Sequence, residues 1–120
     1  LTMSLCGDSL DVYSGNDDQI LPILSLGGAG VISVLSNIAP KLTHQICESF
    51  FEGNFEESKR LQLENLSLIN NLFCDVNPIP VKEAMNMMNM DVRNCRLPLV
   101  SLCDANREKL RSSLTQSGLL

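Results

Sequence analysis

The chain has 120 residues, 44% of them hydrophobic and 19% charged, with a formal net charge of -5 and a pI near 4.7. This composition is that of one globular domain and excludes a largely disordered chain. The acidic balance argues against nucleic acid or an anionic membrane as a partner, because both attract basic surfaces. A membrane-spanning helix is not expected either, since no apolar run approaches the roughly 18 residues that a span needs.

The N-terminal stretch LTMSLCGDSLDV lacks the basic flank and long apolar core of a secretory signal peptide. It begins with Leu, so we expect the chain to be a piece of a longer translated product. The five cysteines form no CxxC pair and stand in apolar contexts. Buried free thiols in a reducing cytoplasm are therefore expected rather than disulfides or metal ligands, at Cys6, Cys47, Cys74, Cys95 and Cys103.

The first elements in chain order predict a strand, a helix and a second strand. Residues 10–14 read as a short strand that enters the turn SGNDD, residues 14–18. Apolar residues recur from Ile20 to Leu26 and predict a short helix, which two glycines end. The run GVISV, residues 30–34, is β-branched and hardly alternates, so we expect a strand buried on both faces. Such a βαβ unit is parallel and right-handed.

The rest of the chain predicts helices. Pro40 is expected in the first turn of a helix that Gly53 ends. Residues 55–76 predict one long helix, which the prolines of NPIP at 77–80 break. Three further expectations are a helix opened by Pro80, an extended linker at RLPL (residues 96–99), and a last helix capped by Asp104 that ends near Gly118. Two parallel strands cannot cover their own faces and edges, so the missing strands are expected on a segment that precedes Leu1.

Several stretches together resemble the C-terminal portion of the dihydrodipicolinate synthase family, in the family's order and spacing across essentially the whole chain. NPIPVK and RLPL make the resemblance specific, because related aldolases share the barrel but not this helical-tail motif. The matching stretches are SGNDD at 14–18, GVISV at 30–34 with SN at 36–37 and AP at 39–40, NPIPVK at 77–82, RLPL at 96–99 and GLL at 118–120.

The resemblance implies an α/β fold, the C-terminal part of a (β/α)8 TIM barrel followed by a C-terminal helical extension. Residues 12–14 would be barrel strand seven and residues 30–34 strand eight. Residues 1–53 would then hold the last two βα units, and residues 54–120 the α-helical extension. The helix over residues 17–26 would lie at a subunit contact, since the family is usually a homotetramer.

The resemblance also implies a lyase reaction, in which pyruvate condenses with aspartate semialdehyde through a lysine Schiff base. This is the first committed step of lysine and diaminopimelate biosynthesis, and the family uses no metal or organic cofactor. The Schiff-base lysine, the proton-relaying tyrosine and the threonines beside the substrate would all precede Leu1. We therefore expect no catalytic residue in this chain, the N-terminal half of the barrel as its partner, and no activity from the chain alone.

Two residues are expected to bind substrate. By the resemblance, Ile32 offers its backbone carbonyl to the pyruvate end of the site, at the carboxyl end of strand eight. Gly15 is the second candidate, because a residue without a Cβ lets a ligand approach the backbone closely. The carboxyl ends of barrel strands are where ligands bind in this fold. An ordinary core isoleucine is the structural alternative for Ile32, and Gly15 is the weaker candidate of the two.

Other chemistry-bearing residues have structural explanations. A Schiff-base lysine must lose its solvent, whereas the four lysines here lie in polar helical contexts, so we expect Lys41, Lys59, Lys82 and Lys109 to be structural. Asp17 and Asp18 could form an acid–base pair or bind a metal, but helix capping also explains them. We also expect His44 to be structural.

Two alternative functions remain open on the residues. The first is a pyruvate aldolase of the same superfamily, similar to N-acetylneuraminate lyase, with the same Schiff-base chemistry and a larger substrate. The second is a non-catalytic helical interaction domain. NPIPVK favours the synthase over the first, and an interaction domain would leave GVISV and SGNDD without a purpose.

Overall fold

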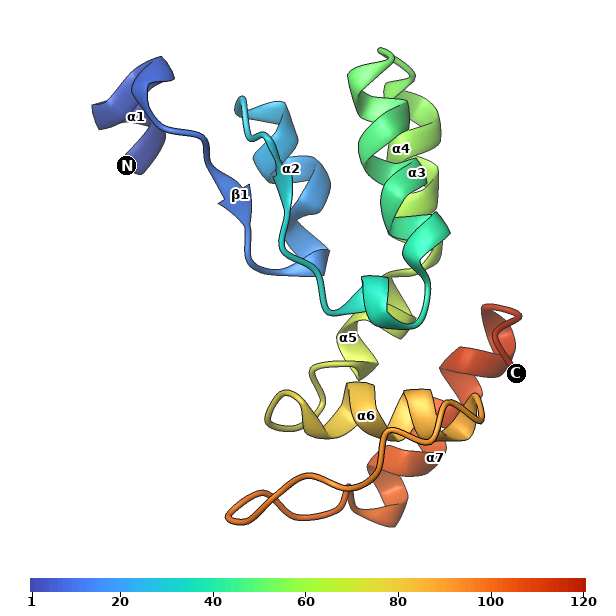
Figure 1. Cartoon of the computed structure of the whole chain (residues 1–120). Coiled ribbons are helices and arrows are strands. Elements are labelled where there is room, and N and C mark those ends of the chain that lie inside the picture. Colours follow the sequence, from blue (N-terminus) through green and yellow to red (C-terminus); the bar gives the residue numbers. More distant parts are fainter.

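The computed structural model of the protein describes the backbone of all 120 residues and every side chain except that of Asp8. Residues 13–31 and 40–64 form one end of the molecule, called the sheet end, and residues 66–116 form the other, called the helical end (Figure 1). In chain order they are α1 (Thr2–Cys6), η1 (Gly7–Ser9), β1 (Tyr13–Ser14), η2 (Asp17–Gln19), α2 (Ile20–Ser25), β2 (Gly30–Val31), η3 (Leu35–Asn37), α3 (Pro40–Phe51), α4 (Phe55–Glu64), α5 (Leu66–Asn71), α6 (Ile79–Met87) and α7 (Asp104–Gln116), where η marks a 3-10 helix.

The predicted order of strand, helix and parallel strand is confirmed, although the first strand covers only Tyr13–Ser14 of the expected residues 10–14. Strands β1 and β2 pair in parallel, with Tyr13 opposite Gly30 and Ser14 opposite Val31. The ladder continues one bond further at its carboxyl end, where the Ile32 amide donates to the Ser14 carbonyl at 2.8 Å. Helix α2 connects the strands and ends at two glycines, as its sequence predicts.

The second strand differs from its prediction. It was expected over residues 30–34, but only Gly30–Val31 lie in the ladder, because the chain turns into η3 immediately afterwards. In this chain the run is not covered on both faces, since Ile32 is 71% exposed. The covering strands were expected on a segment before Leu1, so burial of both faces stays a prediction for a complete barrel. The sheet has two strands among the described residues, and two strands cannot cover each other's faces.

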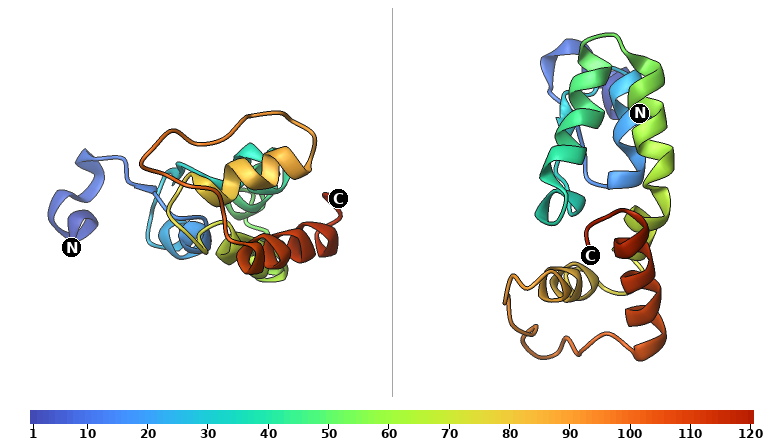
Figure 2. Two further views of the ribbon diagram at one scale, coloured as in Figure 1. Left: turned by 90° about the horizontal axis from the view of Figure 1, so that it is seen from below. Right: turned by 90° about the vertical axis from the view of Figure 1, so that its right-hand side faces the viewer.

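Helix α3 follows its sequence closely. Pro40 occupies the first turn, where its missing N–H would have no partner inside the helix anyway. The helix ends at Phe51, and the chain then turns at Gly53, whose φ of 82° lies in the left-handed region that glycine favours. Helix α3 packs against both α2 and α4 (Figures 1 and 2), and its Ile46 joins Ile20 and Leu24 in a small apolar core.

The long helix expected over residues 55–76 is two helices, α4 and α5. The break falls at Asn65, whose side-chain amide donates to the Leu61 carbonyl at 2.9 Å. Asn side chains compete in this way with backbone amides for helix carbonyls, and the helix stops where they win. A cap that the sequence reasoning missed begins α4, where the Asn54 side chain accepts from the Glu57 amide at 3.3 Å.

The C-terminal helices confirm the expected break at NPIP and the role of Pro80 in the first turn of α6. Three details are corrected. RLPL forms a tight turn rather than an extended linker, since the Leu99 amide donates to the Arg96 carbonyl at 3.1 Å. Asp104 is the first residue of α7 and makes no capping bond, and α1 was not anticipated.

The larger core lies at the helical end, where α5, α6 and α7 pack together (Figure 2). Residues of η3 and of the turn after it also enter this core, so the chain after β2 is anchored there. Its buried side chains are Leu35, Ile38, Ala39, Leu68, Ile69, Leu72, Ile79, Val81, Ala84, Leu102, Leu110 and Leu114. Among the described residues, no helix is both long and apolar enough to cross a bilayer.

Candidate functional site

The candidate site lies at the carboxyl ends of β1 and β2. Gly15 directly follows β1, and Ile32 directly follows β2. The last ladder bond, from the Ile32 amide to the Ser14 carbonyl at 2.8 Å, brings these two strand ends together. Both residues are exposed.

Open space surrounds Gly15. A methyl group built on its Cα would meet no atom within 4 Å. The turn beneath it is held by the buried Ser14 hydroxyl, which donates to the Asn16 carbonyl at 2.7 Å and accepts from the Asn16 amide at 3.2 Å. The backbone at Gly15 is therefore fixed in place while the space above it stays free.

Asp17 has a different role from those the sequence suggested. Its side chain is buried, 1% exposed, and one carboxylate oxygen accepts from the backbone amides of Val34 at 3.0 Å and Leu35 at 2.9 Å. The carboxylate thus caps the turn after β2 rather than the helix after β1. Asp18 is exposed, so the two neighbouring aspartates do not share one environment and form no acid–base pair.

Gln62 of α4 completes this arrangement and was missed by the sequence reasoning. Its side-chain amide donates to the backbone carbonyl of Asp17 at 2.9 Å, and the residue is 4% exposed. A glutamine inside a polar helix carries no sequence signal for such a contact across 45 positions. Within the described residues, Asp17 Oδ1 and Gln62 Oε1 have no hydrogen-bond partner.

The other candidates lie away from the strand ends, and three of the four lysines are exposed, as expected of structural residues. Lys59 pairs with Glu56 at 2.6 Å, and exposed His44 pairs with Glu48 at 3.2 Å. Lys82 is half-buried and donates to the Asn94 carbonyl at 3.0 Å. No cluster of three or more metal-ligating side chains occurs in the described part of the chain.

The five cysteines are free thiols, and the expectation of burial holds only in part. Four are half-buried, and Cys103 is exposed. Burial raises the pKa of the Cys47 thiol, and burial followed by the nearby Asp75 carboxylate raises that of Cys74. A raised pKa leaves less thiolate at neutral pH, so these two thiols are poor nucleophiles.

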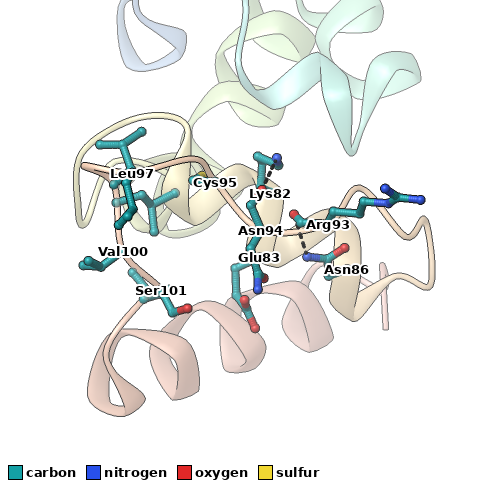
Figure 3. Close-up of a pocket in the computed structure, with 12 residues that line it drawn as sticks. Lys82, Glu83, Asn86, Arg93, Asn94, Cys95, Leu97, Val100 and Ser101 are labelled. Atoms are coloured by element: carbon teal, nitrogen blue, oxygen red, sulfur yellow. Dashed lines mark hydrogen bonds between the residues drawn. The ribbon is translucent and has the colours of Figure 1, made fainter.

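A cavity of about 300 Å³ lies between α6 and the segment that leads to α7 (Figure 3). Three of its polar side chains are engaged with the chain around it. Lys82 donates to the Asn94 backbone carbonyl, the side-chain Oδ1 of Asn86 accepts from the Val92 amide at 2.9 Å, and Glu83 pairs with Arg107 of α7 at 2.7 Å. These contacts hold the segment against α6, far along the chain from Gly15 and Ile32.

Comparison with known proteins places this geometry in context. The model of the dihydrodipicolinate synthetase family matches residues 2–117. A 4-hydroxy-tetrahydrodipicolinate synthase of Clostridium perfringens is 58% identical over 116 residues, which are 97% of this chain and 40% of that protein. The enzyme of the same name from Acetivibrio thermocellus is 52% identical over 118 residues, 98% of this chain and 40% of its own length.

Solved structures of dihydrodipicolinate synthases are also similar to this chain. Dihydrodipicolinate synthase from Thermotoga maritima superposes with a TM-score of 0.92 at 43% identity, covering 98% of this chain and 40% of that one. The Acinetobacter baumannii enzyme, described as complexed with pyruvate, gives 0.92 at 36% identity, with 98% and 40% coverage. The fold is therefore that of part of these α/β enzymes, and the chain spans about 40% of the length of the relatives it matches.

Proposed function

This chain belongs to the dihydrodipicolinate synthetase family, and we propose that it works as part of a complete 4-hydroxy-tetrahydrodipicolinate synthase. The observation that carries the proposal is the family match over residues 2–117, together with 58% identity to an enzyme of that name. The substrates would be pyruvate and aspartate semialdehyde. The complete protein would be a lyase of lysine and diaminopimelate biosynthesis.

The proposed architecture assigns β1 and β2 to strands seven and eight of a (β/α)8 barrel. Residues 1–53 would hold the last two βα units, and residues 54–120 the helical extension. The parallel pairing of the two strands and the 71% exposure of Ile32 support this assignment, because a barrel strand needs neighbours that this chain does not contain. The N-terminal half of the barrel is the proposed partner.

In the proposed reaction, a lysine amine on that N-terminal half attacks the ketone carbon of pyruvate and forms an imine with loss of water. Loss of a methyl proton then gives an enamine, whose carbon attacks the aldehyde carbon of aspartate semialdehyde. This chain would supply no catalytic residue. Its contribution would be the Ile32 carbonyl, as an acceptor at the pyruvate end, and the open backbone at Gly15. No metal or organic cofactor is needed.

The complete protein is further proposed to be a cytoplasmic homotetramer, with the segment from η2 through α2 to Leu26 at one subunit contact. The 71% exposure of Leu26 supports this, because an apolar side chain at the end of a helix gains from burial against another subunit.

A chimera tests the proposed function. The C-terminal part of the Clostridium perfringens enzyme that matches this chain would be replaced by the chain itself, and formation of hydroxytetrahydrodipicolinate would be measured. We expect an active synthase, whose imine with pyruvate is trapped by borohydride and seen by mass spectrometry. This chain alone, assayed as the control, should be inactive. A folded, tetrameric chimera without imine formation would overturn the proposal.

A further inference from the structure

We infer that Asp17 is a positioning residue for the substrate end of the site, and that Gln62 links this position to the helical extension. The inference rests on the proposed function, because it concerns the backbone groups of Gly15 and Ile32 that would meet pyruvate. Asp17 would not touch substrate. It would hold the two strand ends in the geometry that binding needs.

The first step is the bond across the strand ends. The Asp17 carboxylate lies two residues after Gly15, and the amides it accepts belong to Val34 and Leu35, two and three residues after Ile32. Both distances, 3.0 and 2.9 Å, are those of good hydrogen bonds, and a charged acceptor makes them stronger than neutral ones. One side chain thus joins the two segments whose backbones form the candidate site.

Asp17 is buried, unlike the two residues of the candidate site. Asp17 is 1% exposed, whereas Ile32 is 71% exposed and Gly15 lies open. A general acid or base must come within hydrogen-bond reach of the reacting group, which a buried carboxylate engaged with two amides does not do. The bonds are also shielded from water, so their loss is felt in the position of the loop. The effect of Asp17 on substrate is therefore indirect.

Asp17 is also held from the helical extension. Gln62 of α4 donates to the Asp17 carbonyl at 2.9 Å, so the same residue is held through its side chain by the turn after β2 and through its backbone by α4. The turn after β1, η3 and the lower end of α4 meet near the middle of the molecule (Figure 1). A displacement of α4 would thus be transmitted to both strand ends through one residue.

Two measurements test the inference. The first is hydrogen exchange on this 120-residue chain, which reports whether Asp17 protects the amides of Val34 and Leu35. We expect Asp17→Ala to speed the exchange of these amides at least about tenfold. Asp17→Asn should restore most of the protection, because the amide oxygen of Asn still accepts their hydrogen bonds. In the chimera, Asp17→Ala should raise the KM for pyruvate about tenfold, since small displacements of binding groups are costly. Asp17→Asn should recover most of that loss.

The control is Ser58→Ala in α4. The Ser58 hydroxyl is fully buried and donates to the Ile46 carbonyl at 2.7 Å, so the variant loses a buried bond of α4 that does not involve the strand ends. It should reduce stability while leaving the KM for pyruvate unchanged. A merely structural role for Asp17 would lower the amount of active enzyme, and hence kcat, in the same way and with an unchanged KM.

The outcomes separate the two proposals. Unchanged exchange at Val34 and Leu35 in Asp17→Ala contradicts the tether, whatever the reaction is. Faster exchange with an unchanged KM for pyruvate contradicts the positioning role. An inactive parent chimera that forms no imine overturns the proposed function and the link to pyruvate with it, while the exchange experiment on the chain still decides the tether.

Discussion

The sheet end of this chain buries its apolar side chains less completely than the helical end does. At the helical end, α5, α6 and α7 bury a continuous apolar core. At the sheet end, the buried apolar cluster among the described side chains is Ile20, Leu24 and Ile46, while Ile32 and Leu26 are each 71% exposed. Helices can close a core among themselves, whereas a parallel strand needs neighbours on both edges and cover on both faces. The difference therefore indicates where the chain needs a partner.

Truncating a buried leucine in each core should reveal the largest difference between the two ends. Leu110→Ala removes a fully buried side chain from the helical core and should lower the free energy of unfolding by about 4 kcal/mol, toward the upper part of the range for leucine. Leu24→Ala should cost about 2 kcal/mol, because the small core around it is bordered by half-buried residues that can close the gap. Urea denaturation of the chain measures both. Equal losses would contradict the idea that the two cores differ in completeness.

Substitutions at two glycines test how closely the chain is packed at the sheet end. Gly28→Ala should lower the free energy of unfolding by about 1–3 kcal/mol, because the added methyl group would lie 2.5 Å from Ile23 Cγ2 and 2.8 Å from the Ile23 carbonyl oxygen. Gly15→Ala is the matched control and should change stability by less than about 0.5 kcal/mol, since its methyl group meets open space. Thermal melts followed by circular dichroism measure both. A tolerated Gly28→Ala would mean that α2 and β2 are not held closely.

The smallest effect is expected on the exposed face of α4, between the two ends. Hydrogen bonds from Arg60 lower the pKa of the Glu57 carboxyl. A lowered folded-state pKa gives stability that is present above the unfolded pKa and is lost as the pH falls through the folded value. Arg60→Ala should return the Glu57 pKa toward its ordinary range, as measured by NMR titration, with little change in stability because the pair is in solvent. A large loss of stability would show that this surface contributes to joining the two ends.

The sequence predicted the elements whose signals are local. Pro40 and Pro80 mark helix starts because their fixed φ suits a first turn, and the glycines after α2 and α3 mark helix ends. The parallel pairing of β1 and β2 also follows from the strand–helix–strand order. Gly15 and Ile32 were singled out as substrate-binding residues by resemblance to a family, and that role stays a prediction.

The sequence did not predict what depends on contacts between distant segments. Asp17 looks like an ordinary helix cap, and only the fold reveals that its carboxylate bonds amides 17 and 18 positions away. Gln62 reaches Asp17 across 45 positions without any motif. The break at Asn65 was missed because it depends on which of two donors wins a single carbonyl. Such competition leaves no periodic trace in the sequence.

The tether at Asp17 has a consequence for how this loop can vary among natural or designed sequences. Its partners at Val34 and Leu35 are main-chain N–H groups, which nineteen of the genetically encoded amino acids possess. The bond therefore does not depend on which side chain stands at position 34, although the Val34 side chain itself packs against the apolar core of the helical end. Proline is the one replacement that lacks this N–H group, so Val34→Pro should loosen the turn where another apolar residue of similar size keeps it.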